Sequence, residues 1–325
     1  MPSLTPVSFG AHVVGAGFLH DLPLFALADG RFVVGETGAD QVTTQAHGDA
    51  ILAVAVSADG KWAVTVGDDG RVMRHGAGEA RLVAEKKNKW IDQVAIGPQE
   101  AVAFASGRTA WVALANGSVL EFPHEKAVGG VAFLPKGLRL ATATTDKACL
   151  LWVNAKGNPV DLPWKGAHTG ITVSPDGRFV VTTMQEPALH GWRVEDVKHM
   201  RMTGYPVKVK SISWSTKGKY LATSGAGAAI LWPFITKDGP MGKAPLQLGA
   251  TAQTVVRVAC HPAEEVVAIG YDDGLVLAVR FSDNAEVVLR RPDKDPLSAL
   301  AWDRDGGRLA FGTEGGAAGV IDIRS

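Results

Sequence analysis

The chain has 325 residues, 46% of them hydrophobic, and its 33 basic and 33 acidic residues give a net charge of zero. A balanced charge excludes a global field that would draw the protein to nucleic acid or to a membrane surface. The sequence holds no apolar run long enough to span a bilayer, and residues 1–17 lack the basic and apolar regions of a signal peptide. We therefore expect a cytoplasmic protein without a membrane partner.

A ten-residue pattern of an apolar run, a turn and a second apolar run recurs along the chain. It reads VSADGKWAVT at 56–65, VSPDGRFVVT at 173–182 and WSTKGKYLAT at 214–223. The last apolar residue before each first turn anchors a repeat, and the eight anchors are Phe18, Val56, Ile96, Phe133, Val173, Trp214, Cys260 and Trp302. The 284 residues from first to last anchor make seven steps of about 41 residues. A period of roughly 40–45 is typical of a four-stranded propeller blade.

The residues inside each repeat favour strands over helices. In 128–153, short runs rich in apolar residues are separated by turn residues. Glycine takes the fourth place after the anchor in five repeats, where a turn with positive φ suits it. These glycines are Gly60, Gly137, Gly177, Gly218 and Gly306. Asp-Gly pairs within 68–70 and 272–274 predict tight hairpins.

The N-terminal run at residues 4–10 precedes the first repeat, whereas the last repeat stops after its third strand-like run. An unpaired edge strand there would be a site of aggregation. We therefore predict that residues 4–10 pair with the last blade and close the ring. The whole chain, residues 1–325, is expected to form a single all-β domain, a β-propeller of eight four-stranded blades. The alternative is seven blades.

The repeats resemble those of WD-repeat (WD40) propellers, whose pattern combines a Gly-His pair, a turn like SPDG, an Asp in the second turn and a Trp ending the third strand. The repeat anchored at Phe133 matches most fully, with His124, Thr142, Asp146 and Trp152 in place. The repeat anchored at Val56 has His75 where the pattern has Trp. The resemblance implies that such His, Thr and Asp side chains form a hydrogen-bond network inside the blade, not a catalytic triad. Most members of the family have seven blades, but the spacing here favours eight.

No motif for catalysis or metal binding stands out. The sequence has no P-loop, no GxSxG and no HExxH motif. Its nine histidines never stand four apart or in an HxH pair, and Cys149 and Cys260 lack metal-ligand spacing. Both cysteines lie in apolar stretches, which predicts buried free thiols rather than a disulfide. We expect no cofactor, no metal and no enzymatic activity.

The segments that enter the third to sixth repeats carry cations and aromatic residues, the types that interfaces favour. On consecutive blades they would form an arc on one face. The candidate partner-binding residues are Lys86, Lys87, Lys89, Trp90, Lys126, Trp164, Lys165, His168 and Lys208. The alternative is a solvated lysine rim with the Trp rings packed against neighbouring blades.

The sequence thus predicts a non-catalytic scaffold that binds a partner protein or an acidic peptide on this face. Single-stranded nucleic acid would suit the same arc, but the zero net charge disfavours it. The alternative from another class is a propeller enzyme, or a binder of small ligands or metals, that uses the central channel. Quinone-dependent eight-bladed dehydrogenases resemble the chain only in blade number. The abundance of Ala, Gly and Val is typical of a bacterial source.

Overall fold

The structure is a computed structural model that describes residues 3–36, 41–76 and 80–324. Its regular structure in these ranges is antiparallel β-sheet, apart from two 3₁₀ turns at Pro98–Glu100 and Thr216–Gly218. The expected all-β propeller class with four-stranded blades is confirmed. Contacts divide the chain into two compact units. The first is Met1–Ile51, Ala58–Trp62 and Val209–Ser325, and the second is Leu52–Ser57 and Ala63–Lys208. One domain over 1–325 stays a prediction.

The first compact unit contains antiparallel sheets of four strands each. The strands are β2 (Val13–Leu19), β3 (Leu22–Leu27), β4 (Arg31–Val34) and β5 (Val42–Gln45); β20 (Ile212–Trp214), β21 (Tyr220–Thr223), β22 (Ala229–Pro233) and β23 (Leu246–Leu248); β24 (Val255–Cys260), β25 (Val266–Tyr271), β26 (Val276–Arg280) and β27 (Glu286–Arg290); and β28 (Leu297–Trp302), β29 (Arg308–Thr313), β30 (Ala317–Asp322) and β1 (Ser3–Ser8). Apolar side chains of neighbouring sheets form a shared core, as where Val13 and Phe25 pack with Ala299 and Val320. Each buried Val or Phe there contributes roughly 1.5–3 kcal/mol.

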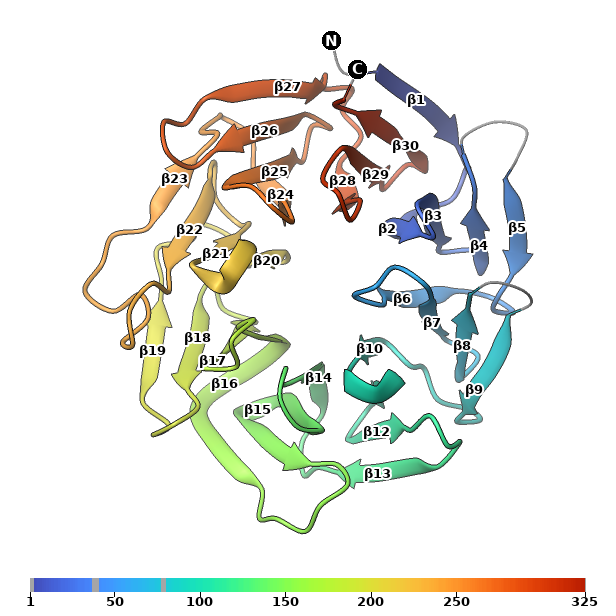
Figure 1. Ribbon diagram of the computed structural model, residues 1–325, viewed down its shortest axis with the longest axis vertical. Coiled ribbons are helices and arrows are strands. Elements are labelled where there is room, and N and C mark those ends of the chain that lie inside the picture. The colour runs from blue at the N-terminus through green and yellow to red at the C-terminus, as the bar shows by residue number, and fades with distance from the viewer. Residues whose placement is uncertain (1–2, 37–40, 77–79, 325) are drawn as a thin grey trace. The chain divides into compact units, whose positions relative to one another are not determined.

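The N-terminal strand completes the last sheet, as predicted. β1 pairs antiparallel with β30, with Leu4 opposite Ile321 and Val7 opposite Ala318 (Figure 1). The Phe9 N–H donates to the Gly316 carbonyl at 2.9 Å and continues the pairing beyond the strand. The edge of β30 is therefore covered by a segment from the other end of the chain.

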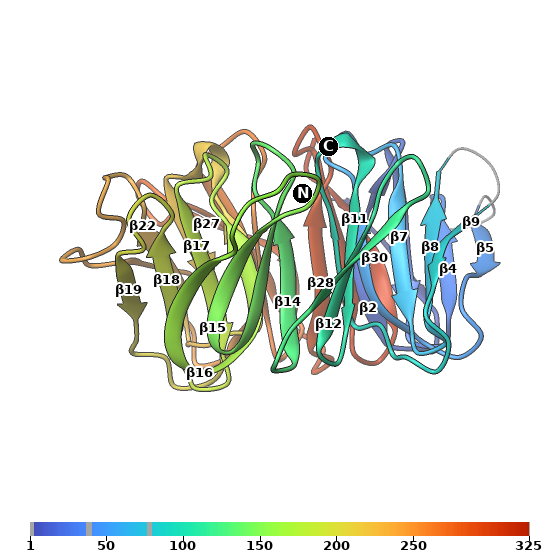
Figure 2. The same cartoon turned by 90° about the horizontal axis from the view of Figure 1, so that it is seen from below.

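The second compact unit continues the same antiparallel pattern. Its strands are β6 (Ile51–Val56), β7 (Ala63–Gly67), β8 (Arg71–His75) and β9 (Arg81–Glu85); β10 (Gln93–Ile96), β11 (Val102–Ser106), β12 (Thr109–Ala113) and β13 (Val119–Pro123); and β14 (Val128–Phe133), β15 (Arg139–Trp152), β16 (Val160–Val173), β17 (Phe179–Met184), β18 (Leu189–Arg193) and β19 (His199–Met202). The last six form one sheet. β15 and β16 are its longest members, with 14 residues each, and Figure 2 shows β16 as a long curved ribbon beside β15.

The expected count of eight separate blades is wrong, since the described strands form seven sheets. The repeats anchored at Phe133 and Val173 share the six-stranded sheet because β16 runs on from the first repeat into the second. β15 lies within the first repeat and supplies strand segments on both sides of Asp146, which has φ +69°. The first half of β15 pairs with β14 and its second half with β16. The first half of β16 pairs with β15, and its second half pairs with β17. The anchors themselves each lie at or next to the end of a strand.

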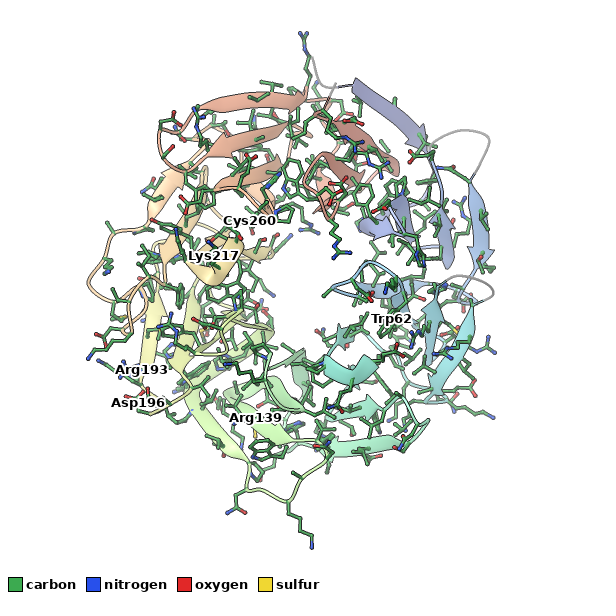
Figure 3. The ribbon with its side chains drawn as sticks, viewed as in Figure 1. Trp62, Arg139, Arg193, Asp196, Lys217 and Cys260 are labelled. Atoms are coloured by element: carbon green, nitrogen blue, oxygen red, sulfur yellow. The ribbon has the colours of Figure 1, made fainter. Side chains whose placement is uncertain are left out.

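The predicted turns are confirmed, and the predicted buried free thiol is confirmed for Cys149 but not for Cys260, which is only partly buried. Gly60, at the fourth place after its anchor, has φ +67°, and its four counterparts also have positive φ. Cys149 is a buried free thiol. Cys260, labelled in Figure 3, is a half-buried free thiol. Burial raises the pKa of both thiols to about 12, so both are protonated at neutral pH.

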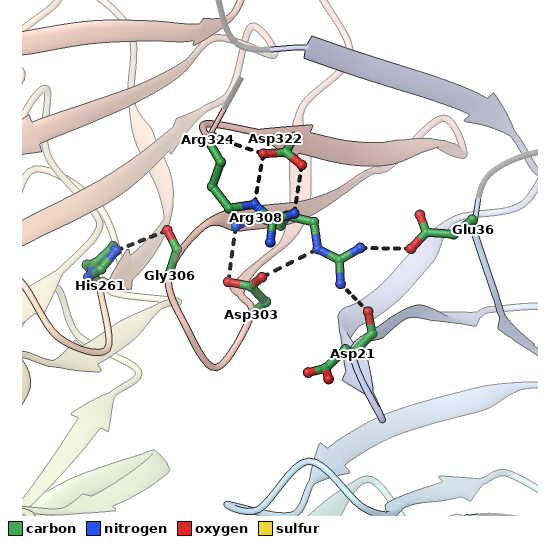
Figure 4. A network of polar contacts seen from close by, with 8 residues as sticks. All are labelled: Asp21, Glu36, His261, Asp303, Gly306, Arg308, Asp322 and Arg324. Atoms are coloured by element: carbon green, nitrogen blue, oxygen red, sulfur yellow. Dashed lines mark hydrogen bonds and ion pairs between the residues drawn. The ribbon is translucent and has the colours of Figure 1, made fainter.

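Arg308 links two sheets of the first compact unit (Figure 4). Its Nη1 lies 2.7 Å from Glu36 Oε1 in the segment that follows β4, and its Nη2 donates to the Asp21 carbonyl in the β2–β3 turn. Its backbone N–H donates to Asp303 Oδ1 at 3.0 Å. Both Arg308 and Asp303 are largely buried, so these charge-assisted contacts are less screened than surface ion pairs.

Candidate partner-binding face

Four connecting segments lie at one end of the strands of the second compact unit. In four consecutive antiparallel strands, the second and fourth run in the same direction, so the hairpin after the second and the connection after the fourth lie at the same end. Each connection contacts such a hairpin: Lys86 N–H donates to the Gly70 carbonyl (2.8 Å), His124 N–H to the Arg108 carbonyl (2.8 Å), Gly166 N–H to Asp146 Oδ1 (3.0 Å) and Lys208 Nζ to Gln185 Oε1 (3.0 Å). We call this end, made of residues 86–90, 124–126, 164–168 and 205–208 with those hairpins, the crossover face.

The loop after β9 presents four of the predicted residues. Trp90 is 72% exposed, and Lys87 and Lys89 are exposed as well. Lys86 is half-buried, and its Nζ lies 4.9 Å from the centroid of the Trp111 ring, a cation–π distance. The loop thus offers an exposed aromatic ring beside three positive charges, one of them held in place.

Lys126 is exposed and lines a cleft of about 540 Å³ beside β15 and β16. Inside the cleft, Lys147 Nζ and Asp161 Oδ2 form an ion pair of 2.8 Å. Burial lowers the pKa of His124, which also lines the cleft, and raises that of Cys149. A thiol with so high a pKa is not an activated nucleophile. Cys149 is therefore a protonated thiol in the lining of this cleft.

Trp164 and Lys165 lie in the middle of β16, where the chain passes between repeats. Lys165 is exposed and Trp164 is half-buried. The indole stacks on the His190 ring, with centroids 3.8 Å apart and planes inclined by 14°, and its centroid lies 5.0 Å from that of His199. Trp164 therefore combines the two alternatives: its ring packs within the sheet, yet part of it remains exposed.

His168 is not available to a partner, which corrects the prediction for this residue. It is 3% exposed, with Nδ1 2.8 Å from Thr182 Oγ1 and Nε2 2.9 Å from the Trp164 carbonyl oxygen. Burial lowers its pKa. His168 thus holds residues 164–168 in place through its contact with the Trp164 carbonyl. The sequence signal that identifies this role is Thr182, which occupies the family's Thr position in the repeat anchored at Val173.

The remaining predicted cation, Lys208, is half-buried through its contact with Gln185. Exposed carboxylates also lie on the crossover face: Glu125 precedes Lys126, and Asp146 and Glu186 belong to hairpins. The face is therefore mixed in charge rather than uniformly basic. Its densest positive charge is in the loop 86–90, which holds three lysines and no acid.

The hydrogen-bond network that the resemblance implies is made in some repeats and not in others. In the repeat anchored at Val56, Thr65 Oγ1 lies 2.8 Å from His75 Nε2, so His75 replaces the family's Trp as the partner. In the repeat anchored at Phe133, His124 Nε2 and Thr142 Oγ1 are buried without a hydrogen-bond partner. The network that the resemblance implies is therefore not formed by His124 and Thr142.

The described residues bring together no group of three or more His, Cys, Asp or Glu that could hold a metal ion. The His168–Thr182 pair cannot present a nucleophile to a substrate, because the Thr182 side chain is fully buried. Over residues 3–36, 41–76 and 80–324, no helix has the length and hydrophobicity needed to cross a membrane.

Comparison with known proteins bears on the repeats and on the fold. Residues 38–73 and 117–153 match the WD40 family model, described as WD domain, G-beta repeat. No curated protein matches the sequence. The crystal structure of the computationally designed Ika8 protein is similar over 97% of this chain and 98% of that chain, with a TM-score of 0.78 and 17% sequence identity. At this identity the likeness concerns the fold alone.

Proposed function

We propose, from the premise that this chain is a WD40-repeat β-propeller, that it is a non-catalytic scaffold that binds an acidic segment of a protein partner on the crossover face of its second compact unit. Propellers of this kind commonly mediate protein interactions and are typically not enzymes. In this proposal the protein works in the cytoplasm, without a cofactor and without a membrane partner.

The observation that carries the proposal is the loop 86–90. Trp90 exposes most of its ring, although burying a large aromatic side chain is favourable. Trp is among the residue types enriched at binding hot spots. The lysines beside it supply positive charge, which attracts carboxylates and steers their approach. Together these features favour an acidic segment that also carries an apolar side chain.

The test uses a fluorescein-labelled synthetic peptide in which Asp and Glu flank a central Phe. Its binding to the wild type is compared with binding to the variant Lys86→Glu, Lys87→Glu, Lys89→Glu, by fluorescence anisotropy. We expect the affinity of the variant for the peptide to be lower by a factor of about ten or more, because three attractive charges become repulsive. A factor of ten in affinity corresponds to about 1.4 kcal/mol.

A matched control reverses three exposed lysines at the opposite end of the same strands: Lys136→Glu, Lys156→Glu, Lys198→Glu. The control has the same net charge, so it isolates the position of the charges, and it should bind like the wild type. Equal weakening in both variants would overturn the proposed face. An unlabelled single-stranded oligonucleotide that binds more tightly than the peptide, with a steep salt dependence, would favour nucleic acid instead.

A further inference from the structure

A second hollow on the crossover face, of about 360 Å³, lies beside Trp164. Trp164, Met184 and Ala188 supply apolar surface to its walls. The volume is at the lower end of the roughly 300–1,000 Å³ that ligand sites occupy, which is room for one large side chain rather than for a cofactor. We call it the Trp164 pocket.

The walls of the Trp164 pocket are held in place from behind. The stacking of Trp164 on the fully buried His190 fixes the indole plane, and His168 Nε2 lies 2.9 Å from the Trp164 carbonyl oxygen. The Gly166 N–H donates to Asp146 Oδ1 at 3.0 Å, which fixes the turn at the pocket's edge. A pocket whose walls are already ordered loses little conformational entropy on binding.

The charges around the Trp164 pocket balance. Lys165 and Arg201 contribute two positive charges, and Asp146 and Glu186 contribute two negative charges. A charged group entering the pocket would gain little net Coulomb energy and would lose its hydration. An uncharged side chain avoids this cost and gains from the removal of its apolar surface from water.

We propose that the Trp164 pocket receives an uncharged aromatic or large aliphatic side chain, the anchor residue of the acidic partner segment. The assignment of that side chain to an acidic partner rests on the proposed function. The pocket's preference for an apolar, uncharged group rests on its own lining. Phe in place of Ala at the anchor position should tighten binding by about tenfold or more, the effect of burying one large apolar side chain.

The first experiment probes the pocket without any acidic group. Methionine methyl groups labelled with ¹³C are followed by NMR while N-acetyl-phenylalaninamide or N-acetyl-alaninamide is added to the full-length protein. Met184 lies in the pocket, so its methyl resonance should shift with the phenylalanine probe and not with the alanine probe. Met202, buried in the same sheet, and Met241, exposed in the first compact unit, serve as internal controls. If the Met184 resonance does not shift selectively, the proposal that this pocket receives an apolar side chain is wrong.

Two further measurements separate the pocket from the proposed function. The variant Lys86→Glu, Lys87→Glu, Lys89→Glu should keep the Met184 shift while it loses the acidic peptide. If the acidic peptides with Phe and with Ala bind the wild type equally, the pocket is refuted and the lysine loop retained. Trp164→Phe keeps an aromatic ring against His190 and should preserve the preference for Phe, whereas Trp164→Ala should abolish it. If Trp164→Ala does not fold, the Met184 shift in the wild type still decides.

Discussion

The repeats anchored at Val56 and Phe133 differ in their hydrogen bonds, and the repeat with the less complete family motif makes the bond that the other lacks. The first lacks the family's Trp but buries a Thr65–His75 pair at 2.8 Å. The second has the family's residues, yet His124 Nε2 and Thr142 Oγ1 have no hydrogen-bond partner. The comparison teaches that a network depends on where the third-strand residue points, not on whether the motif is complete.

His75 and Trp152 occupy the same place in their repeats, but His75 is buried and Trp152 is not. Trp152 is 40% exposed, and the Arg139 guanidinium carbon lies 4.8 Å from its ring centroid. A Cβ at Gly157 would clash with the ring atom Cδ1, so the absence of a side chain there allows the ring to lie against the loop. By contrast Trp192, at the same place in the next repeat, is fully buried. Burial of the indole does not by itself supply a partner for the threonine, since the Trp192 N–H donates to the Pro163 carbonyl and the Thr182 hydroxyl contacts His168.

The largest contrast should come from the two tryptophans. Trp192→Ala removes a fully buried indole and is expected to lower the free energy of unfolding by about 3–5 kcal/mol. Trp152→Ala removes a half-exposed ring and one cation–π contact, and it should lower the free energy of unfolding by about 1 kcal/mol. Urea unfolding of both variants measures the difference. Equal losses would show that Trp152 is packed inside its repeat.

The two threonines give a smaller, isosteric contrast. Thr65→Val removes the hydroxyl that contacts buried His75 and should cost about 1–3 kcal/mol, since it leaves a buried polar atom without this partner. Thr142→Val replaces a buried hydroxyl that has no hydrogen-bond partner, so stability should stay the same or rise. The same urea experiment applies. A loss for Thr142→Val as large as that for Thr65→Val would contradict the distinction.

The smallest expected effect is on the pH dependence of stability in mild acid. His190 is fully buried, and burial, aided by nearby His199, His168 and Arg201, lowers its pKa to about 3. Between that value and the pKa of about 6.5 in the unfolded chain, the unfolded state binds more protons, so stability is full above pH 6.5 and falls as the pH decreases. The loss from this one group is about 1 kcal/mol between pH 6 and pH 5.

The variant His190→Leu should therefore show a flatter fall in stability between pH 6 and pH 5 than the wild type. The matched change, His124→Leu, acts on a histidine that is only half-buried and whose pKa burial also lowers, so it should flatten the curve less. Parallel curves for wild type and His190→Leu would mean that His190 has a partner that keeps its pKa near the ordinary value.

The sequence allowed the strands, the turn glycines and the pairing of residues 4–10 with the last sheet to be predicted, because these follow from local alternation and from an otherwise unpaired edge. The merging of two repeats was not predicted, since the continuity of β15 and β16 depends on backbone pairing across Asp146 and Gly166. On the candidate site, composition indicated the exposed lysines and Trp90. Composition could not distinguish these exposed residues from His168, which is buried and contacts Thr182 on another strand.

The continuous strand β16 also affects how this protein can change over evolution. In a repeat protein whose units meet only through loops, one unit can be duplicated, lost or exchanged, since each contacts mainly its neighbours. Here the backbone that ends one repeat is the backbone that begins the next, so there is no neutral junction between them. We therefore expect insertions to be better accommodated at the loops that join the other repeats than within β16.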